Sequence, residues 1–365
     1  MRKYLFLFVF HLLLCSQQQY AQKIETGYYQ LLKGSISNIP ITMNLTQCGD
    51  DYSGIYYYDK YQIPIFMGGK LNATKNKIEL TSEINGKVET FSLNKIQDDF
   101  NGEWVSGNLI LPVKLNKVNT PFNWKTYRQE LTLPLRPNME DGPKLSCDVK
   151  LVWPEGESPT ADFVRKQILK LLNLSTNSTT NRPEDIVRSV NNDFRKSYFE
   201  THKDDNNEDI KENAFAFSEE HNVGISLYNL NYQYLTLKNA FYEYMGGAHG
   251  MGGSIFINLD LKLKTEITLS NLFTPSGLKQ LPRLLEQQFR IDQKLKPGQS
   301  LVDGGLFENK IEQVSDNFYL TQKGIGFYYL QYEIAPYAMG PIEIVLPFSK
   351  IKALLKPTAM SYFIP

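Results

Sequence analysis

The chain has 365 residues, and its 39 basic and 39 acidic side chains give a formal net charge of zero. This balance argues against electrostatic nucleic-acid binding, which requires a basic excess. The length suggests two domains of ordinary size. Aromatic residues make up 13% of the chain, including 22 tyrosines. Because tyrosine fits half-buried pleated surfaces, the composition favours an exported, β-rich protein.

Residues 1–21 predict a signal peptide. Arg2 and Lys3 form a cationic start, and residues 4–14 form an apolar run. This run is shorter than the ~20 residues that span a bilayer, but it fits the roughly 7–15 residues of a signal-peptide core. We expect cleavage after Ala21 and export to the periplasm or the surface of a bacterium. Cys15 offers an alternative, in which a lipid on this cysteine tethers the protein to a membrane.

Two further cysteines, Cys48 and Cys147, allow two interpretations. An oxidising compartment would permit a disulfide between them. Alternatively, both are buried and unpaired thiols, and the sequence alone does not decide between the two.

Residues 22–118 predict an antiparallel all-β domain. Eight short runs of strand-forming residues are separated by clusters of Gly, Asn and Asp, which is typical of a meander. Asn85 and Gly86 indicate the clearest hairpin, because a two-residue type I′ turn needs positive φ at both central residues. Eight strands of this length could close into a small barrel. A sandwich is the alternative.

Residues 119–143 contain four prolines and predict a linker, because proline disrupts both helices and central strands. Residues 144–365 predict an α+β domain, since helix-periodic and strand-like segments alternate there. The acidic residues 204–212 predict a solvated loop, without the glycine and spacing of a calcium site. The predicted helices are residues 158–172, 182–200, 278–289 and 349–355, and the predicted strands are residues 145–153, 223–232, 234–244, 254–261, 324–331 and 341–346.

Three segments of the second domain together carry a family resemblance. They are residues 244–250 (YMGGAHG), residues 267–289 beginning with ITLSNLF, and residues 320–327 (LTQKGIGF) leading into residues 332–340 (YEIAPYAMG). The combination resembles the uncharacterised C-terminal domain of a lysozyme-sensing anti-sigma factor, which is also appended to some peptidoglycan deacetylases. The resemblance covers roughly residues 214–356.

The resemblance implies an extracytoplasmic module of the cell envelope. In the sensor, the corresponding domain binds lysozyme, so a wall glycan or a wall-attacking protein is the partner that the resemblance implies. An anti-sigma role is not expected, because the sequence shows no apolar segment that would cross a membrane and lead to a sigma-binding segment. Deacetylase chemistry is not expected either, because the closely spaced histidines of that catalytic domain are missing.

Three residues of these segments are candidates for ligand binding. His249 lies among Gly246, Gly247 and Gly250, which permit unusual backbone conformations. Its ring could face a ligand, or it could bond neighbouring carbonyl groups and fix the turn. Glu333 and Tyr337 could bind a sugar or a peptide through a carboxylate and a phenol. Alternatively, Glu333 pairs with a lysine and the tyrosine packs in the core with its hydroxyl at the surface.

No motif in the sequence indicates catalysis. His202, His221 and His249 are separated by 19 and 28 residues, whereas zinc motifs usually include a closely spaced pair. Nucleophile elbows, phosphate-binding loops and dinucleotide fingerprints are missing too. We therefore expect no catalytic residue, metal, cofactor or nucleic acid, and we predict non-catalytic recognition at the cell envelope. The alternatives are an envelope hydrolase assembled from distant residues and a small-lipophile carrier with a hollow β domain.

Overall fold

The structure, a computed structural model, describes residues 23–72, 74, 76–84, 86–139, 141–176, 182–231, 233–321 and 323–363. The predicted signal peptide, residues 1–21, and Cys15 lie outside the described residues. Within the described ranges, no helix is both long enough and apolar enough to cross a membrane.

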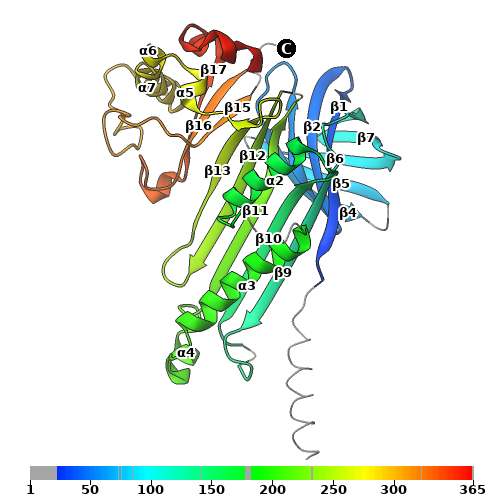
Figure 1. Ribbon diagram of the computed structural model, residues 1–365, viewed down its shortest axis with the longest axis vertical. Coiled ribbons are helices and arrows are strands. Elements are labelled where there is room, and N and C mark those ends of the chain that lie inside the picture. Colours follow the sequence, from blue (N-terminus) through cyan, green and yellow to red (C-terminus); the bar gives the residue numbers. More distant parts are fainter. Residues whose placement is uncertain are drawn as a thin grey trace, which may run out of the picture.

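The first eight strands form a closed antiparallel barrel (Figure 1). Each strand pairs with the next one along the chain, and β8 returns to pair with the second half of β1, from Leu32–Lys117 to Ile36–Val113. Closure leaves the barrel without an exposed edge in this part. The predicted meander is confirmed, and the barrel is the correct alternative. The strands are β1 (Glu25–Ile36), β2 (Ile39–Cys48), β3 (Asp51–Tyr58), β4 (Ile65–Asn72), β5 (Lys77–Ile84), β6 (Lys87–Ile96), β7 (Asp99–Ser106) and β8 (Leu109–Lys117).

The turn between β5 and β6 has the predicted length. Ile84 pairs with Lys87 across it, and Gly86 has a φ of 74°, as the two-residue turn requires. Asn85 itself lies outside the described residues.

Apolar side chains fill the inside of the barrel. Ile41, Met43 and Leu45 lie on one face of β2 and are fully buried. The rings of Tyr56 and Phe91 meet edge to face, with 5.0 Å between their centroids. Both belong to one continuous core of the barrel. A filled interior gives no support to the small-lipophile carrier.

Residues 119–143 are not the linker that the prolines predicted, because they contain the strand β9 (Trp124–Pro134). One edge of β9 pairs with the first residues of β1, and the other pairs with β10 (Lys144–Pro154) along its whole length. Pro134 ends β9 and the other prolines lie outside it, so none interrupts the hydrogen bonds of the strand interior. Because β1 pairs with both β8 and β9, the sheet continues from the barrel into the second part of the chain. The division into domains stays a prediction.

Helices cover one face of the sheet beyond the barrel (Figure 1). β10 and β11 are parallel, and a parallel pair needs a long crossover, which here contains α2, α3 and α4. The Ser158 hydroxyl accepts a hydrogen bond from the Ala161 N–H at 3.0 Å, so the predicted helix start is confirmed. The elements are α2 (Pro159–Leu171), α3 (Pro183–Thr201), α4 (Asn207–Glu212), β11 (Glu219–Leu230), β12 (Tyr234–Met245), β13 (Met251–Asp260) and β14 (Thr265–Glu266).

The acidic segment differs from the predicted loop, because its last six residues form α4. The Asn206 side chain accepts a hydrogen bond from the Glu208 N–H at 2.9 Å and caps the helix. Ile210 is fully buried and fixes the helix to the core. Glu208 and Asp209 lie in the first turn, where carboxylates interact favourably with the helix dipole.

A small antiparallel sheet and short helices surround a separate core in the C-terminal part. Asn258 on β13, which is 1% exposed, fastens this sheet: its amide donates to the Phe318 carbonyl at 2.8 Å and accepts from the Leu320 N–H at 3.0 Å. The predicted α+β class is confirmed. The elements are α5 (Leu269–Leu272), α6 (Pro275–Leu278), α7 (Leu281–Asp292), β15 (Phe318–Thr321), β16 (Gly324–Tyr329), η1 (Tyr337–Met339), β17 (Ile342–Pro347), α8 (Phe348–Ile351), η2 (Lys352–Leu354) and η3 (Pro357–Tyr362).

Cys48 and Cys147 are buried free thiols, so the disulfide alternative is not realised. Cys48 lies beside Thr126 of β9, whereas Cys147 packs with Leu131 of β9. Positions 126 and 131 point to opposite faces of the strand, so the two thiols lie on opposite sides of the sheet. Burial, with a contribution from the Glu219 charge, raises the pKa of Cys147 to about 12.

Candidate functional site

Two of the three segments that carry the resemblance, residues 244–250 and 320–340, meet in the structure. His249, in the turn between β12 and β13, stacks on Tyr337 of η1, with 4.0 Å between the ring centroids and 24° between the planes. The Tyr337 hydroxyl donates a hydrogen bond to the Gly250 carbonyl oxygen at 2.7 Å, across 87 positions of sequence. The contact therefore joins two of the three predicted site residues.

Glycines shape the turn that presents His249. Gly246 and Gly247 have φ values of 75° and 95°, which glycine adopts at little cost. A Cβ atom on Gly250 would lie 2.5 Å from the Tyr242 hydroxyl, so Tyr242 covers this position. The Nδ1 atom of His249 lies 3.3 Å from the neighbouring Gly250 carbonyl oxygen. His249 thus contacts a neighbouring carbonyl group, as expected of a residue that stabilises its own turn, while its side chain stays exposed.

Glu333 holds its own loop together. Its carboxylate accepts a hydrogen bond from the Leu330 N–H at 2.7 Å. The neighbouring Gln331 accepts from the Gly252 N–H at 3.3 Å and ties this loop to β13. Glu333 therefore positions the loop, and Tyr332 and Tyr337 supply its exposed and half-buried aromatic rings.

These contacts produce an exposed aromatic surface. Tyr242, His249, Tyr332 and Tyr337 form what we call the loop surface. Tyr332 is 50% exposed and Tyr242 is 37% exposed, and the Tyr332 and Tyr337 ring centroids are 5.8 Å apart. Each of these side chains offers an apolar ring and a polar atom, which suits recognition of a partner that has both characters.

A second polar cluster joins the end of α3 to the start of β11. The Glu219 carboxylate lies between His202 Nε2, at 3.4 Å, and His221 Nε2, at 3.0 Å. His202 Nδ1 also contacts Asp205 at 2.7 Å, and His221 Nδ1 lies 3.9 Å from Glu243. Carboxylates and imidazoles thus alternate along a chain that could move protons. In the described part of the protein, no group of three or more His, Cys, Asp or Glu side chains could hold a metal ion.

Sequence patterns did not predict this cluster. The predicted strand began at residue 223, so Glu219 and His221 were not recognised as neighbours on one face of a strand. His202 belongs to the preceding helix, and only the crossover brings it to β11. Their side chains are no more than 12% exposed. The cluster therefore has convergent polar groups but little access for a substrate.

A third cluster lies at the seam between the barrel and the following sheet. Arg128 on β9 is 9% exposed. Its guanidinium donates to both Asp148 carboxylate oxygens, at 2.9 and 3.0 Å, and to Asp51 on β3 at 2.6 Å. Such two-pronged pairs are strong and directional. Burial opposes the charge on Asp51, but hydrogen bonds from Lys70 and Arg128 outweigh it and lower the pKa of Asp51.

The helix side of the sheet also holds a cavity of about 620 Å³. Its walls are mainly apolar and include Leu172, Phe194 and Phe241, with the carboxylates of Asp193 and Glu243 at its lining. The loop surface is distinct, because Tyr242 and Phe241 are consecutive residues of β12 and point to opposite faces of the sheet.

Two family models match the C-terminal part of the chain. Residues 155–252 match the family described as "Deacetylase PdaC", and residues 270–349 match the family described as "Protein of unknown function (DUF3298)". The C-terminal part therefore contains a region that matches DUF3298. The resemblance expected from the sequence is thereby confirmed, and the PdaC match indicates a protein associated with the cell envelope. His249 lies in the PdaC match and Tyr337 in the DUF3298 region, so the stacked pair joins the two.

Solved structures of DUF3298 proteins are similar to this one. A member of the family from Bacteroides fragilis is 23% identical with a TM-score of 0.60, covering 67% of this chain and 98% of that chain. A DUF3298 family protein from Pseudomonas aeruginosa is 16% identical with a TM-score of 0.46, covering 66% of this chain and 97% of that chain. The first comparison shows a shared fold. No curated protein matches the sequence.

Proposed function

We propose that this protein is a non-catalytic recognition protein of the bacterial cell envelope. In this proposal, the loop surface binds a wall glycan or a wall-attacking protein such as lysozyme. The observation that carries the proposal is the loop surface itself, in which two distant segments hold Tyr242, His249, Tyr332 and Tyr337 together.

The physical properties of the loop surface suit recognition. Tyrosine supplies a large contact area and has only two side-chain torsions to immobilise, so little conformational entropy is lost on binding. The stack and the hydrogen bond to Gly250 position Tyr337 before a ligand arrives, which lowers the cost of association. Sugar rings and protein surfaces both present apolar patches beside hydrogen-bonding groups, and the loop surface offers the complement to each.

Replacement of the stacked pair tests the proposal. His249→Ala and Tyr337→Ala should each weaken binding to soluble wall fragments or to lysozyme about thirtyfold. This corresponds to the ~2 kcal/mol that defines a binding hot spot. Titration calorimetry with each of the two probes measures the affinity, and thermal melting of the same samples measures the stability. Tyr61→Ala is a matched control, because Tyr61 is 59% exposed in the β3–β4 turn of the barrel.

The same pair of measurements separates recognition from a structural role. If His249 only stabilises its turn, its replacement should remove a hydrogen bond and lower the stability of the protein by ~1 kcal/mol. The affinity for the probes should then stay unchanged. A His249 variant that melts early but binds normally would assign His249 to the turn. If neither variant changes the affinity for either probe, the loop surface is not the binding site.

A second candidate is an envelope hydrolase that uses the buried His202–Glu219–His221 cluster. The alternation of imidazoles and carboxylates favours it, because such chains orient catalytic histidines. This candidate predicts that the purified protein releases new ends from wall fragments and that His221→Asn abolishes the release. The same variant should leave wall-fragment binding unchanged if the loop surface alone carries the function.

A further inference from the structure

The topology of the barrel places alternate turns at the same end. All neighbouring strands from β1 to β8 are antiparallel, and the barrel is closed by β8 and β1. The turns that follow β1, β3, β5 and β7 therefore share one end of the barrel. The turns that follow β2, β4 and β6 share the other.

Large apolar side chains gather at the first of these ends. Their exposed fractions lie between 46% and 67%, although each residue lies in or beside a turn, where polar residues are usual. Gathered apolar exposure of this kind marks an interaction site more often than single exposed residues do. We call these six residues the apolar rim: Ile39, Tyr61, Ile63, Val88, Leu109 and Ile110.

The opposite end of the barrel has a different character. Its described turn residues are polar or glycine, with Gly49 and Asp50 after β2, Asn76 before β5, and Gln97 and Asp98 after β6. Its exposed apolar residues, such as Ile96 at 54% exposure, are flanked by these polar positions. The contrast indicates that the apolar side chains were not distributed evenly over the turns of the barrel.

Hydrogen bonds hold two of the rim turns in place. The Ser37 N–H donates to the Pro112 carbonyl at 2.6 Å, and the Asp59 N–H donates to the Pro40 carbonyl at 3.1 Å. Asp59 also accepts from the Thr42 hydroxyl at 2.7 Å. These hydrogen bonds order the turns that carry the exposed side chains. The turns therefore need little reorganisation when a partner covers these side chains.

We propose that the apolar rim inserts into the surface of a lipid bilayer. In and beside the four turns, the acidic side chains of Asp59, Glu83 and Glu89 outnumber the basic side chains of Lys60 and Lys87, so attraction to a polyanion is not the driving force. Amphipathic surfaces bind the interface by burying apolar side chains at the boundary of headgroups and acyl chains. Tyr61 suits that boundary because its ring is apolar and its hydroxyl can stay hydrated.

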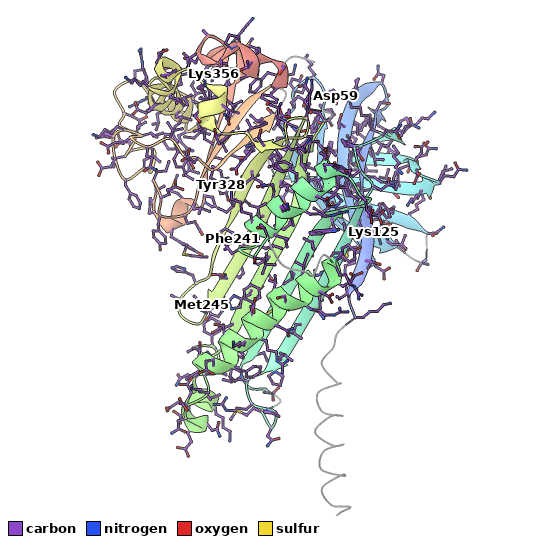
Figure 2. All side chains as sticks on the ribbon, in the orientation of Figure 1. Asp59, Lys125, Phe241, Met245, Tyr328 and Lys356 are labelled. Carbon is purple, nitrogen blue, oxygen red and sulfur yellow. The ribbon has the colours of Figure 1, made fainter. Side chains whose placement is uncertain are left out.

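A lipid surface fits the rim better than a protein partner does. A stable protein interface needs about 800 Å² of well-packed surface on each partner. The apolar side chains of the rim come from separate turns, with the polar residues Asn38, Gln62 and Asn108 between them. A fluid bilayer can surround each apolar side chain separately and leave these polar groups among the headgroups. Asp59 beside the rim and Met245 at the end of β12 lie far apart in Figure 2, so the rim is separate from the loop surface.

Vesicle flotation with the purified protein tests the proposal. The protein should bind phosphatidylcholine vesicles and vesicles of equal parts phosphatidylcholine and phosphatidylglycerol with similar strength, and added salt should change neither. Ile63→Ser and Leu109→Ser should each lower the partition coefficient about tenfold, as expected for the loss of one inserted aliphatic side chain. The matched control is Ile96→Ser at the opposite end of the barrel, which should bind as the unchanged protein does. Circular dichroism melting checks that all variants are folded.

Three outcomes would overturn the proposal. The first is an unchanged protein that binds neither vesicle. The second is a pair of folded rim variants that bind as well as the Ile96 control. The third is a protein that does not bind vesicles but self-associates, with the rim variants abolishing the self-association. This result would assign the rim to contacts between copies of the chain.

Discussion

In the barrel, each strand from β1 to β7 pairs with the strand that follows it, and only the closing pair of β8 and β1 joins distant positions. The α+β region, in contrast, is held together by contacts between segments that are distant in the sequence. Asn258 binds Phe318 across 60 positions, and Tyr337 binds Gly250 across 87. The exposed apolar residues of the barrel lie at turns that a sequence reader can locate. The loop surface exists only after distant segments have docked. The difference teaches that local patterns describe the scaffold better than they describe the site.

The largest expected effects come from the two cores and test whether the regions are independent. Phe91→Ala in the barrel and Phe289→Ala in the C-terminal core should each cost about 3–5 kcal/mol of unfolding free energy, since both side chains are no more than 1% exposed. Because β1 pairs with both β8 and β9, we expect one cooperative transition that both variants shift. Two resolved urea transitions, each shifted by only one of the variants, would show that barrel and α+β region fold separately.

The seam between the two regions gives the next largest effect. Arg128→Leu leaves Asp51 and Asp148 without their shared partner and should cost about 3 kcal/mol, because the guanidinium is largely buried. The control is Arg188→Leu, which removes an exposed pair with Asp185 and should cost less than about 1 kcal/mol. Equal effects in urea unfolding would contradict a structural role for the seam.

Removal of the N-terminal cap of α2 should have a smaller effect on stability. Ser158→Ala removes the hydrogen bond to the Ala161 N–H and should cost about 1 kcal/mol in urea unfolding. Ser158→Asp keeps an acceptor at this position and should restore most of the loss. If the two variants unfold identically, the capping hydrogen bond does not contribute to stability.

The smallest expected effect depends on pH. The pKa of Asp51 is lowered below its usual 3.8 in the folded protein, so its contribution is present above that pH and is lost as the pH falls through the folded-state pKa. Asp51→Asn should therefore lower stability at neutral pH by roughly 0.5 kcal/mol, a value discounted for the partial exposure of this side chain. It should also flatten the acid decline. An unchanged pH profile between neutrality and acid would exclude this contribution.

The sequence predicted the scaffold because its signals are local. Turn spacing predicted the eight barrel strands, and the Ser158 start and apolar periodicity predicted α2. The failure at β9 has a local cause as well, since Pro134 stands at the end of the strand and does not interrupt it. Glu219, His202 and His221 come together only because the crossover places the end of α3 beside the start of β11. The periodicity of the sequence does not predict this placement. Of the residues in the loop surface, His249 and Tyr337 were predicted from their sequence segments. Tyr242, and the loop surface as a whole, became apparent only from the fold.

The most direct test of the recognition function is the affinity of Tyr332→Ala. Tyr332 is 50% exposed, and its ring contacts Tyr337 at a centroid distance of 5.8 Å, so its truncation should affect a ligand more than the fold. We predict that binding to wall fragments or lysozyme weakens about thirtyfold while the melting temperature stays within a degree or two of the unchanged protein. Unchanged affinity for both probes, measured by calorimetry on a variant with normal melting, would contradict the proposal that the loop surface recognises an envelope ligand.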